Sequence, residues 1–152
     1  MQTLPETEAM DVAMLADRLR PVMLKLSRHL RREAQRLGIS VLDAQLLGIV
    51  HKRPAIGISE LAEIEQMSRP SMSVHIKRLE AAGWLKRMED AGGADRRRAP
   101  LMLTPDGEAT LNAIRRSRND WLEARLSGLD ADERRALSAA VEPLVRLVEM
   151  RP

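Results

Sequence analysis

The sequence predicts a mainly helical fold with one small β-hairpin. Apolar residues recur at spacings of three and four through most of the 152 residues, which is the period of amphipathic helices. Phe and Tyr are absent and Trp occurs twice, so aliphatic side chains and nine Met build the core, which suits helix-on-helix packing. One Gly-Gly-containing charged turn separates two short extended segments, which is typical of a hairpin.

The N-terminal part predicts a long helix. We expect residues 1–10 to form a flexible tail and residues 11–37 to form the helix, which Gly38 ends. Pro21 should kink this helix or start a second segment. Its apolar stripe follows helical spacing and comprises Val12, Leu15, Leu19, Val22 or Met23, Leu26 and Leu30.

Three shorter helices follow. Ser40 is a good N-cap for a helix over residues 41–52, whose inner face carries Leu42, Leu46, Leu47 and Val50. After an extended link over residues 55–58, Ser59 should cap a third helix with Leu61, Ala62 and Ile64 facing inward. Ser68 should cap a fourth helix that runs to Ala82, with Pro70 tolerated in its first turn and Met72, Ile76 and Leu79 as its buried stripe.

The hairpin and two further helices complete the chain. Residues 84–89 and 99–103 are the expected strands, and Pro100 should confine the second one to an edge. Thr104 caps a fifth helix, with Pro105 at its first position and Gly128 after its end. Asp130 caps a sixth helix that should bend at Pro143 and whose apolar stripe is Leu137, Val141, Leu144 and Val148.

A short helix, a tight turn, a helix and a hairpin, in that order, predict a winged helix-turn-helix over residues 41–104. Charge favours a polyanionic partner. The chain carries a net charge of +3, and residues 66–98 alone hold eight basic against four acidic side chains. The charge alone would equally fit a solvated surface.

The fourth helix is the candidate reading element. Its outward face carries short side chains at the N-terminal end and basic side chains at the C-terminal end. The short side chains allow the helix to approach base edges in the major groove. The candidate DNA contacts on it are Ser68, Arg69, Pro70, Ser71, Ser73, Val74, Lys77 and Arg78. An ordinary amphipathic surface helix is the alternative interpretation.

The charged turn favours the DNA interpretation. Arg96, Arg97 and Arg98 repel one another in a plain loop, whereas a wing that inserts into the minor groove needs arginine because the potential there is strongly negative. Asp95 would then orient a neighbouring arginine through a charge-assisted pair.

The wing also carries a family resemblance. Asp95-x-Arg97, five residues and Leu103-Thr104 fit the D-x-R-x5-L-T signature of the MarR-type regulators, and the order of six helices over roughly residues 11–150 is similar to that family. The resemblance implies a homodimer that interlocks through residues 11–37 and 105–150 of a single domain over residues 11–152. It also implies a pseudo-palindromic double-stranded DNA site and a repressor that a small anionic or aromatic effector releases.

Three features depart from that family. Val74 stands where an arginine is usual, and the wing is about two residues longer. His75 stands where a buried leucine is usual, and we expect it to be half-buried and bonded to a neighbour. In the family the effector pocket lies between the dimer helices and the DNA-binding lobe; its candidates here are His29, Arg32, Leu46, Leu47 and Val50, which could equally be plain core and surface.

Other function classes find less support. The three histidines fall on three different predicted helices and no catalytic or phosphate-loop motif occurs, so we expect no enzyme. The absence of Cys and of paired His predicts no metal site and no cofactor. No segment resembles a membrane span or a secretory leader, so the expected location is the cytoplasm. A winged-helix module that binds protein or a ligand without specific DNA binding is the alternative.

Overall fold

The computed structural model describes residues 6–88 and 100–150. In that part of the chain it has six helices and one two-stranded antiparallel sheet, which confirms the predicted fold class. The elements are α1 (Glu6–Arg36), α2 (Val41–Lys52), α3 (Ile58–Ile64), α4 (Arg69–Ala81), β1 (Leu85–Arg87), β2 (Leu101–Leu103), α5 (Pro105–Leu126) and α6 (Ala131–Glu149).

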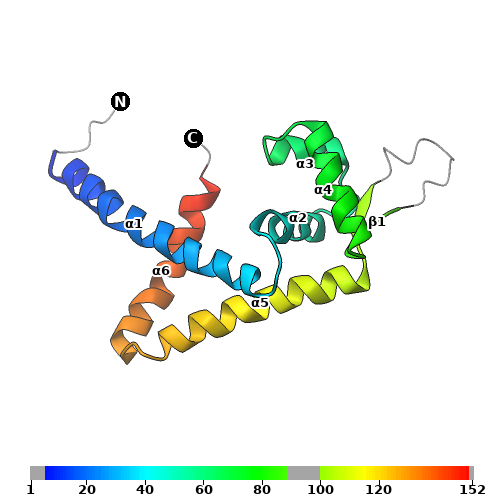
Figure 1. Ribbon diagram of the computed structural model, residues 1–152. Coiled ribbons are helices and arrows are strands. Elements are labelled where there is room, and N and C mark those ends of the chain that lie inside the picture. Colours follow the sequence, from blue (N-terminus) through cyan, green and yellow to red (C-terminus); the bar gives the residue numbers. More distant parts are fainter. Residues whose placement is uncertain (1–5, 89–99, 151–152) are drawn as a thin grey trace.

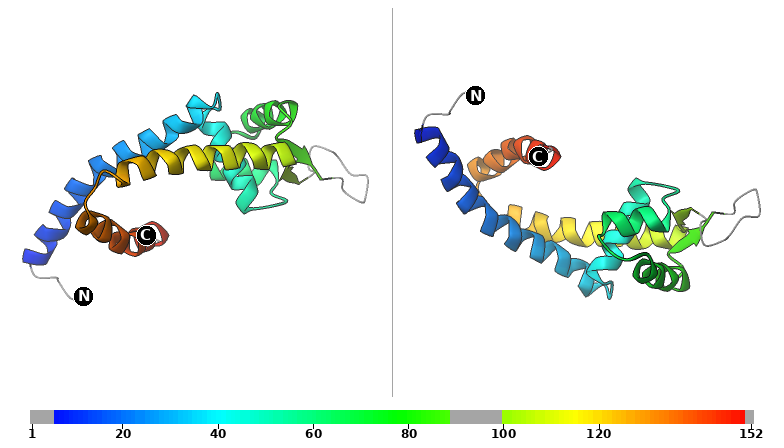
Figure 2. Two further views of the ribbon diagram at one scale, coloured as in Figure 1. Left: turned by 90° about the horizontal axis from the view of Figure 1, so that it is seen from below. Right: turned by 90° about the horizontal axis from the view of Figure 1, so that it is seen from above.

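The molecule is elongated, with a small lobe at one end (Figures 1 and 2). The lobe contains α2, α3, α4 and the hairpin. Helix α5 leaves the lobe at β2 and runs to α6, and α1 packs along α5. The start of α1 and the end of α6 lie away from the lobe (Figure 1).

One aliphatic core holds the lobe together. Its fully buried members come from α2, α3, α4 and β2: Leu46, Leu47, Val50, Leu61, Met72, Ile76, Leu79 and Leu101. The predicted buried stripe of the fourth helix is thereby confirmed. Burial of one such side chain is worth about 1.5–3 kcal/mol, so this core fixes which face of α4 points outward.

The hairpin is paired on both sides at its base. Leu85 lies opposite Leu103, and Arg87 lies opposite Leu101. Leu101 also forms a bridge with Ile56, whose carbonyl accepts a hydrogen bond from the Leu101 amide at 2.9 Å. The expectation that Pro100 leaves the second strand at an edge is therefore wrong at Leu101, because the proline precedes the strand and its missing N–H affects no bond of Leu101.

The start of α5 is locked against the loop before the hairpin. The Thr104 hydroxyl accepts a hydrogen bond from the Gly107 amide at 3.0 Å and donates one to the Gly83 carbonyl. The Thr104 amide donates to the Trp84 carbonyl at 3.0 Å. The predicted N-cap is thus confirmed, and its hydroxyl also ties α5 to the hairpin.

Polar contacts fix α1 on α5. Glu33 is buried and accepts a hydrogen bond from the Ser117 hydroxyl at 3.0 Å, while Arg36 lies 3.3 Å from its other oxygen. Arg118 donates to the Leu30 carbonyl at 3.1 Å, and burial lowers the pKa of its guanidinium. A buried carboxylate with two partners favours one register of the two helices over others.

Several boundaries differ from the predicted ones. Helix α1 begins at Glu6, inside the expected tail, because residues 6–10 include the good helix formers Glu, Ala and Met. It continues through Pro21 as one helix whose axis curves (Figure 2), so no second segment starts there. Gly57, and not Ser59, caps α3, which allows Ile58 to enter the core; Ile64 is exposed at the other end, not inward-facing.

Helices α1 and α6 leave their apolar stripes uncovered. Residues 131–149 of α6 include none that the described part of the chain buries. The exposed apolar side chains are Val12, Leu15, Val22, Met23 and Leu26 on α1, and Leu137, Val141, Val145, Leu147 and Val148 on α6. Within residues 6–88 and 100–150, no helix is long and apolar enough to cross a membrane.

Candidate nucleic-acid interface

The outward face of α4 is small and apolar at its centre and basic at its end. Val74 is 67% exposed in the middle of this face. Pro70, Ser71, Lys77 and Arg78 surround it and are exposed as well. Ser73 is half-buried. The face therefore combines short side chains, which permit close approach, with two cations.

The N-terminus of α4 is capped by serine, as predicted. The Ser68 hydroxyl accepts a hydrogen bond from the Ser71 amide at 3.3 Å and donates to the Ser71 hydroxyl at 2.8 Å. The amides of the first turn point out of the helix end, where the helix dipole favours a phosphate. Arg69 is exposed on this same turn.

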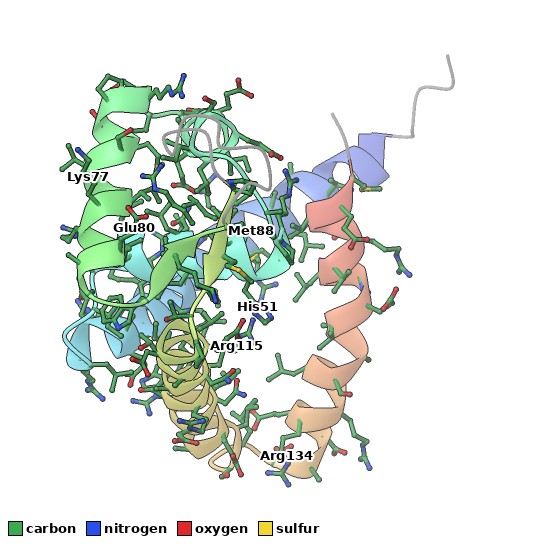
Figure 3. All side chains as sticks on the ribbon, turned by 90° about the vertical axis from the view of Figure 1, so that its right-hand side faces the viewer. His51, Lys77, Glu80, Met88, Arg115 and Arg134 are labelled. Atoms are coloured by element: carbon green, nitrogen blue, oxygen red, sulfur yellow. The ribbon has the colours of Figure 1, made fainter. Side chains whose placement is uncertain are left out.

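Lys77 and Glu80 lie on different sides of α4 (Figure 3). Lys77 projects away from the lobe. Glu80 faces the hairpin and accepts a hydrogen bond from Arg87 of β1 at 2.8 Å. This bond fixes the hairpin relative to α4, which places a basic helix face and the wing base in one rigid unit.

Arg78 is held by the neighbouring helix. Its Nη2 binds the Asp43 carboxylate on α2 and lies 3.3 Å from the His75 Nδ1. His75 is half-buried and bonded to a neighbour, as expected. Sequence reasoning missed Asp43, although a signal exists: it shares the buried face of α2 with Leu47 and Val50, and a carboxylate on such a face needs a partner.

The predicted wing contacts fall outside the described residues. Asp95, Arg96, Arg97 and Arg98 lie within residues 89–99, of which the structure gives no description. The base of the wing is described. There the Met88 amide donates to the Pro100 carbonyl at 2.8 Å, just before the chain leaves the described part.

Three comparisons with known proteins agree with one another. The model of the MarR family matches residues 39–98. An HTH-type transcriptional regulator of Mycobacterium tuberculosis is 29% identical over 140 residues, which make up 92% of this chain and 96% of that protein. A Pseudomonas aeruginosa protein described as a transcriptional regulator superposes with a TM-score of 0.80 at 29% identity, over 97% of this chain and 100% of that one.

The chain is thus similar to the MarR family of transcriptional regulators over residues 39–98, and to transcriptional regulators over most of its length. A MepR variant of Staphylococcus aureus, solved with a bound oligodeoxyribonucleotide, shares the fold at a TM-score of 0.66 and 19% identity, over 88% of this chain and 97% of that one. The resemblance read from Asp95, Arg97, Leu103 and Thr104 is therefore confirmed. The members of this family are regulators and not enzymes.

The five candidate residues of the effector pocket lie in different surroundings. Leu46, Leu47 and Val50 are fully buried in the lobe core, and Arg32 is exposed. His29 is half-buried and stacks on Trp121 of α5, with ring centroids 5.2 Å apart, and Arg125 lies over the same Trp ring at 4.1 Å. The effector pocket stays a prediction, and Trp121 is a residue that the prediction did not include.

The described residues hold no cluster of three or more His, Asp or Glu that could bind a metal. His51 is instead paired with Glu108 at 3.1 Å, which joins α2 to α5 (Figure 3). Several charged side chains of the lobe therefore hold its elements together through ion pairs.

Proposed function

We propose that this chain is a sequence-specific, double-stranded DNA-binding transcriptional regulator that acts as a homodimer. The observation that carries the proposal is the outward face of α4. Its buried stripe fixes the helix orientation, so that Ser71, Val74, Lys77 and Arg78 point away from the lobe together. A helix with short side chains and peripheral cations fits the major groove, where each base pair presents a distinct pattern.

A second copy of the chain accounts for the uncovered stripes of α1 and α6. A helix of 19 residues with no buried side chain gains little from packing, although packing of an amphipathic face supplies most of the stability of helices in proteins. Contiguous apolar faces of this kind mark interaction surfaces. Pairing of α1, α5 and α6 with the same helices of a second copy would cover both stripes and produce a two-fold axis.

In the proposed complex, two α4 helices enter successive major grooves, about 34 Å apart along the duplex. Val74 can contact a thymine methyl, Ser71 and Ser73 can bond to bases or phosphates, and Lys77 can reach a phosphate. Arg96, Arg97 and Arg98 would enter the flanking minor grooves. A two-fold symmetric protein of this kind reads a pseudo-palindromic site.

The regulatory output is the part of the proposal that rests on the similarity to the MarR family. A repressor would occupy its site until a small anionic or aromatic effector preferred a spacing of the two lobes that mismatches the grooves. Its action on chromosomal DNA would place it in the cytoplasm.

Selection of bound duplexes from a random-sequence pool tests the proposal. The expected result is an enriched pseudo-palindrome whose half-sites are about one helical turn apart. Affinity should fall steeply with salt, by about 0.9 log unit per phosphate contact for each log unit of salt. If binding is weak, unselective and indifferent to salt, the chain is instead an interaction module and the proposal fails.

Two substitutions separate the roles of helix and wing. Arg97→Ala should lower affinity for selected and unrelated duplexes alike, because a minor-groove arginine reads groove shape more than base identity. Ser71→Ala should change the sequence preference among selected duplexes. An Arg97→Ala protein with unaltered duplex affinity would show that the assigned role of the wing is wrong.

A further inference from the structure

The Asp43 carboxylate is nearly buried beside the aliphatic core of the lobe. Its side chain is only 11% exposed, and it lies on the same face of α2 as fully buried aliphatic residues. A carboxylate in such a place destabilises the fold unless a partner compensates its charge. The partner is Arg78, 35 positions later on α4, and the two side chains link the first and last helices of the lobe.

The bond uses one end of the guanidinium and leaves the rest outward. Arg78 contacts Asp43 and His75 through Nη2 alone, among the contacts of the described residues. The Arg78 side chain is still 54% exposed, on the same face as Ser71 and Val74. Because a guanidinium carries five N–H donors in a rigid fork, one edge can be fixed by a carboxylate while another meets an anion.

We propose that Asp43 is a positioning residue, which holds Arg78 in the orientation that contacts a phosphate or a guanine edge of duplex DNA. The proposal rests on the proposed function of α4. An arginine that is already held in one geometry loses less side-chain freedom when it binds, and this saving is the contribution of Asp43.

Positioning and simple charge effects have opposite signs, which makes the proposal testable. Loss of a negative charge beside a DNA-binding face should by itself strengthen binding. Loss of a positioning carboxylate should weaken it, by about 2- to 10-fold per half-site and about 4- to 100-fold for a symmetric dimer on two half-sites. Glu63→Gln on the exposed face of α3 is the matched control, because it removes the same charge outside this cluster.

The experiment measures the affinity of the full chain for the duplex that the wild-type protein enriches from a random pool. The variants are Asp43→Ala, Arg78→Ala and the double substitution, with thermal unfolding of each recorded in parallel. Asp43→Ala should weaken binding in the wild-type background and have little effect in the Arg78→Ala background, as a double-mutant cycle requires for a residue acting through another. Arg78→Ala should reduce the salt slope by about 0.9 for each phosphate that the variant no longer neutralises, whereas Asp43→Ala should leave the slope unchanged.

A conservative variant keeps the test valid if Asp43→Ala fails to fold. Asp43→Asn keeps the shape and one acceptor oxygen, and its affinity should fall between those of the wild type and Asp43→Ala. Asp43→Ala or Asp43→Asn binding as tightly as Glu63→Gln would overturn the proposal, and so would equal effects of Asp43→Ala with and without Arg78. A wild-type protein that enriches no duplex would instead refute the proposed function.

Discussion

Gly107 is the residue whose replacement by alanine should be most revealing, because α5 begins in close contact with the loop before the hairpin. A Cβ at this position would lie 2.0 Å from the Trp84 carbonyl oxygen and 3.0 Å from the Trp84 carbonyl carbon. Both are backbone atoms, so no side-chain rotation can relieve the overlap. Gly107→Ala must therefore push the start of α5 away from residues 83–84.

The expected cost follows from the contacts at this junction. The displacement would strain or break the hydrogen bonds from Thr104 to the carbonyls of Gly83 and Trp84, worth about 1 kcal/mol each. Overpacking adds about 1–3 kcal/mol, and the better helix propensity of alanine offsets about 1 kcal/mol. Gly107→Ala should thus destabilise the fold by about 2–4 kcal/mol, which corresponds to a decrease in Tm of roughly 5–15 °C for a chain of this size.

Urea and thermal unfolding at one fixed protein concentration measure this effect. Gly48→Ala is the control, since Gly48 lies inside α2 and a Cβ there meets nothing within 4 Å. That variant should be more stable than the wild type by about 0.5–1 kcal/mol. If Gly107→Ala were as stable as Gly48→Ala, the contact between α5 and the Trp84 carbonyl would not exist in the folded protein.

Three further changes test other parts of the fold. Gln66 has a positive φ of 51° in the turn before α4, so Gln66→Gly should raise the free energy of unfolding by up to about 1 kcal/mol in urea; a decrease would show that its side chain contributes more than its strain costs. Asp130→Ala removes the capping box of α6 and should cost about 1 kcal/mol in the same assay, and no change would mean that α6 is frayed at its start. Val141→Glu places a charge on the α6 stripe and should weaken self-association by about 3–5 kcal/mol in sedimentation experiments, whereas an unchanged dimer would move the interface elsewhere.

The ends of most helices could be predicted because their signals are local. Ser40, Thr104 and Asp130 cap the helices that follow them, and each bond joins residues two or three positions apart. The spacing of apolar residues likewise sufficed to identify the buried face of α4. These features depend on a few neighbouring residues, which a single sequence displays completely.

The contacts that could not be predicted join distant parts of the chain. The bridge between Ile56 and Leu101 makes the second strand interior at that point, and no pattern within either segment indicates the other. Asp43 finds its partner on another helix, so its position on an apolar face signals a need for pairing but not which cation meets it. The stripes of α1 and α6 were found correctly, but periodicity shows only that a face is apolar and does not tell what covers it.

The sparse aromatic composition gives this protein a simple optical spectrum. With no Tyr or Phe, absorption and emission in the near ultraviolet come from Trp84 and Trp121 alone. Trp84 packs between the lobe core and the start of α5, while Trp121 lies far along α5 between His29 and Arg125. Two variants that each keep one of the tryptophans would therefore report separately on the junction of the lobe with the start of α5 and on the far part of α5, without any attached dye.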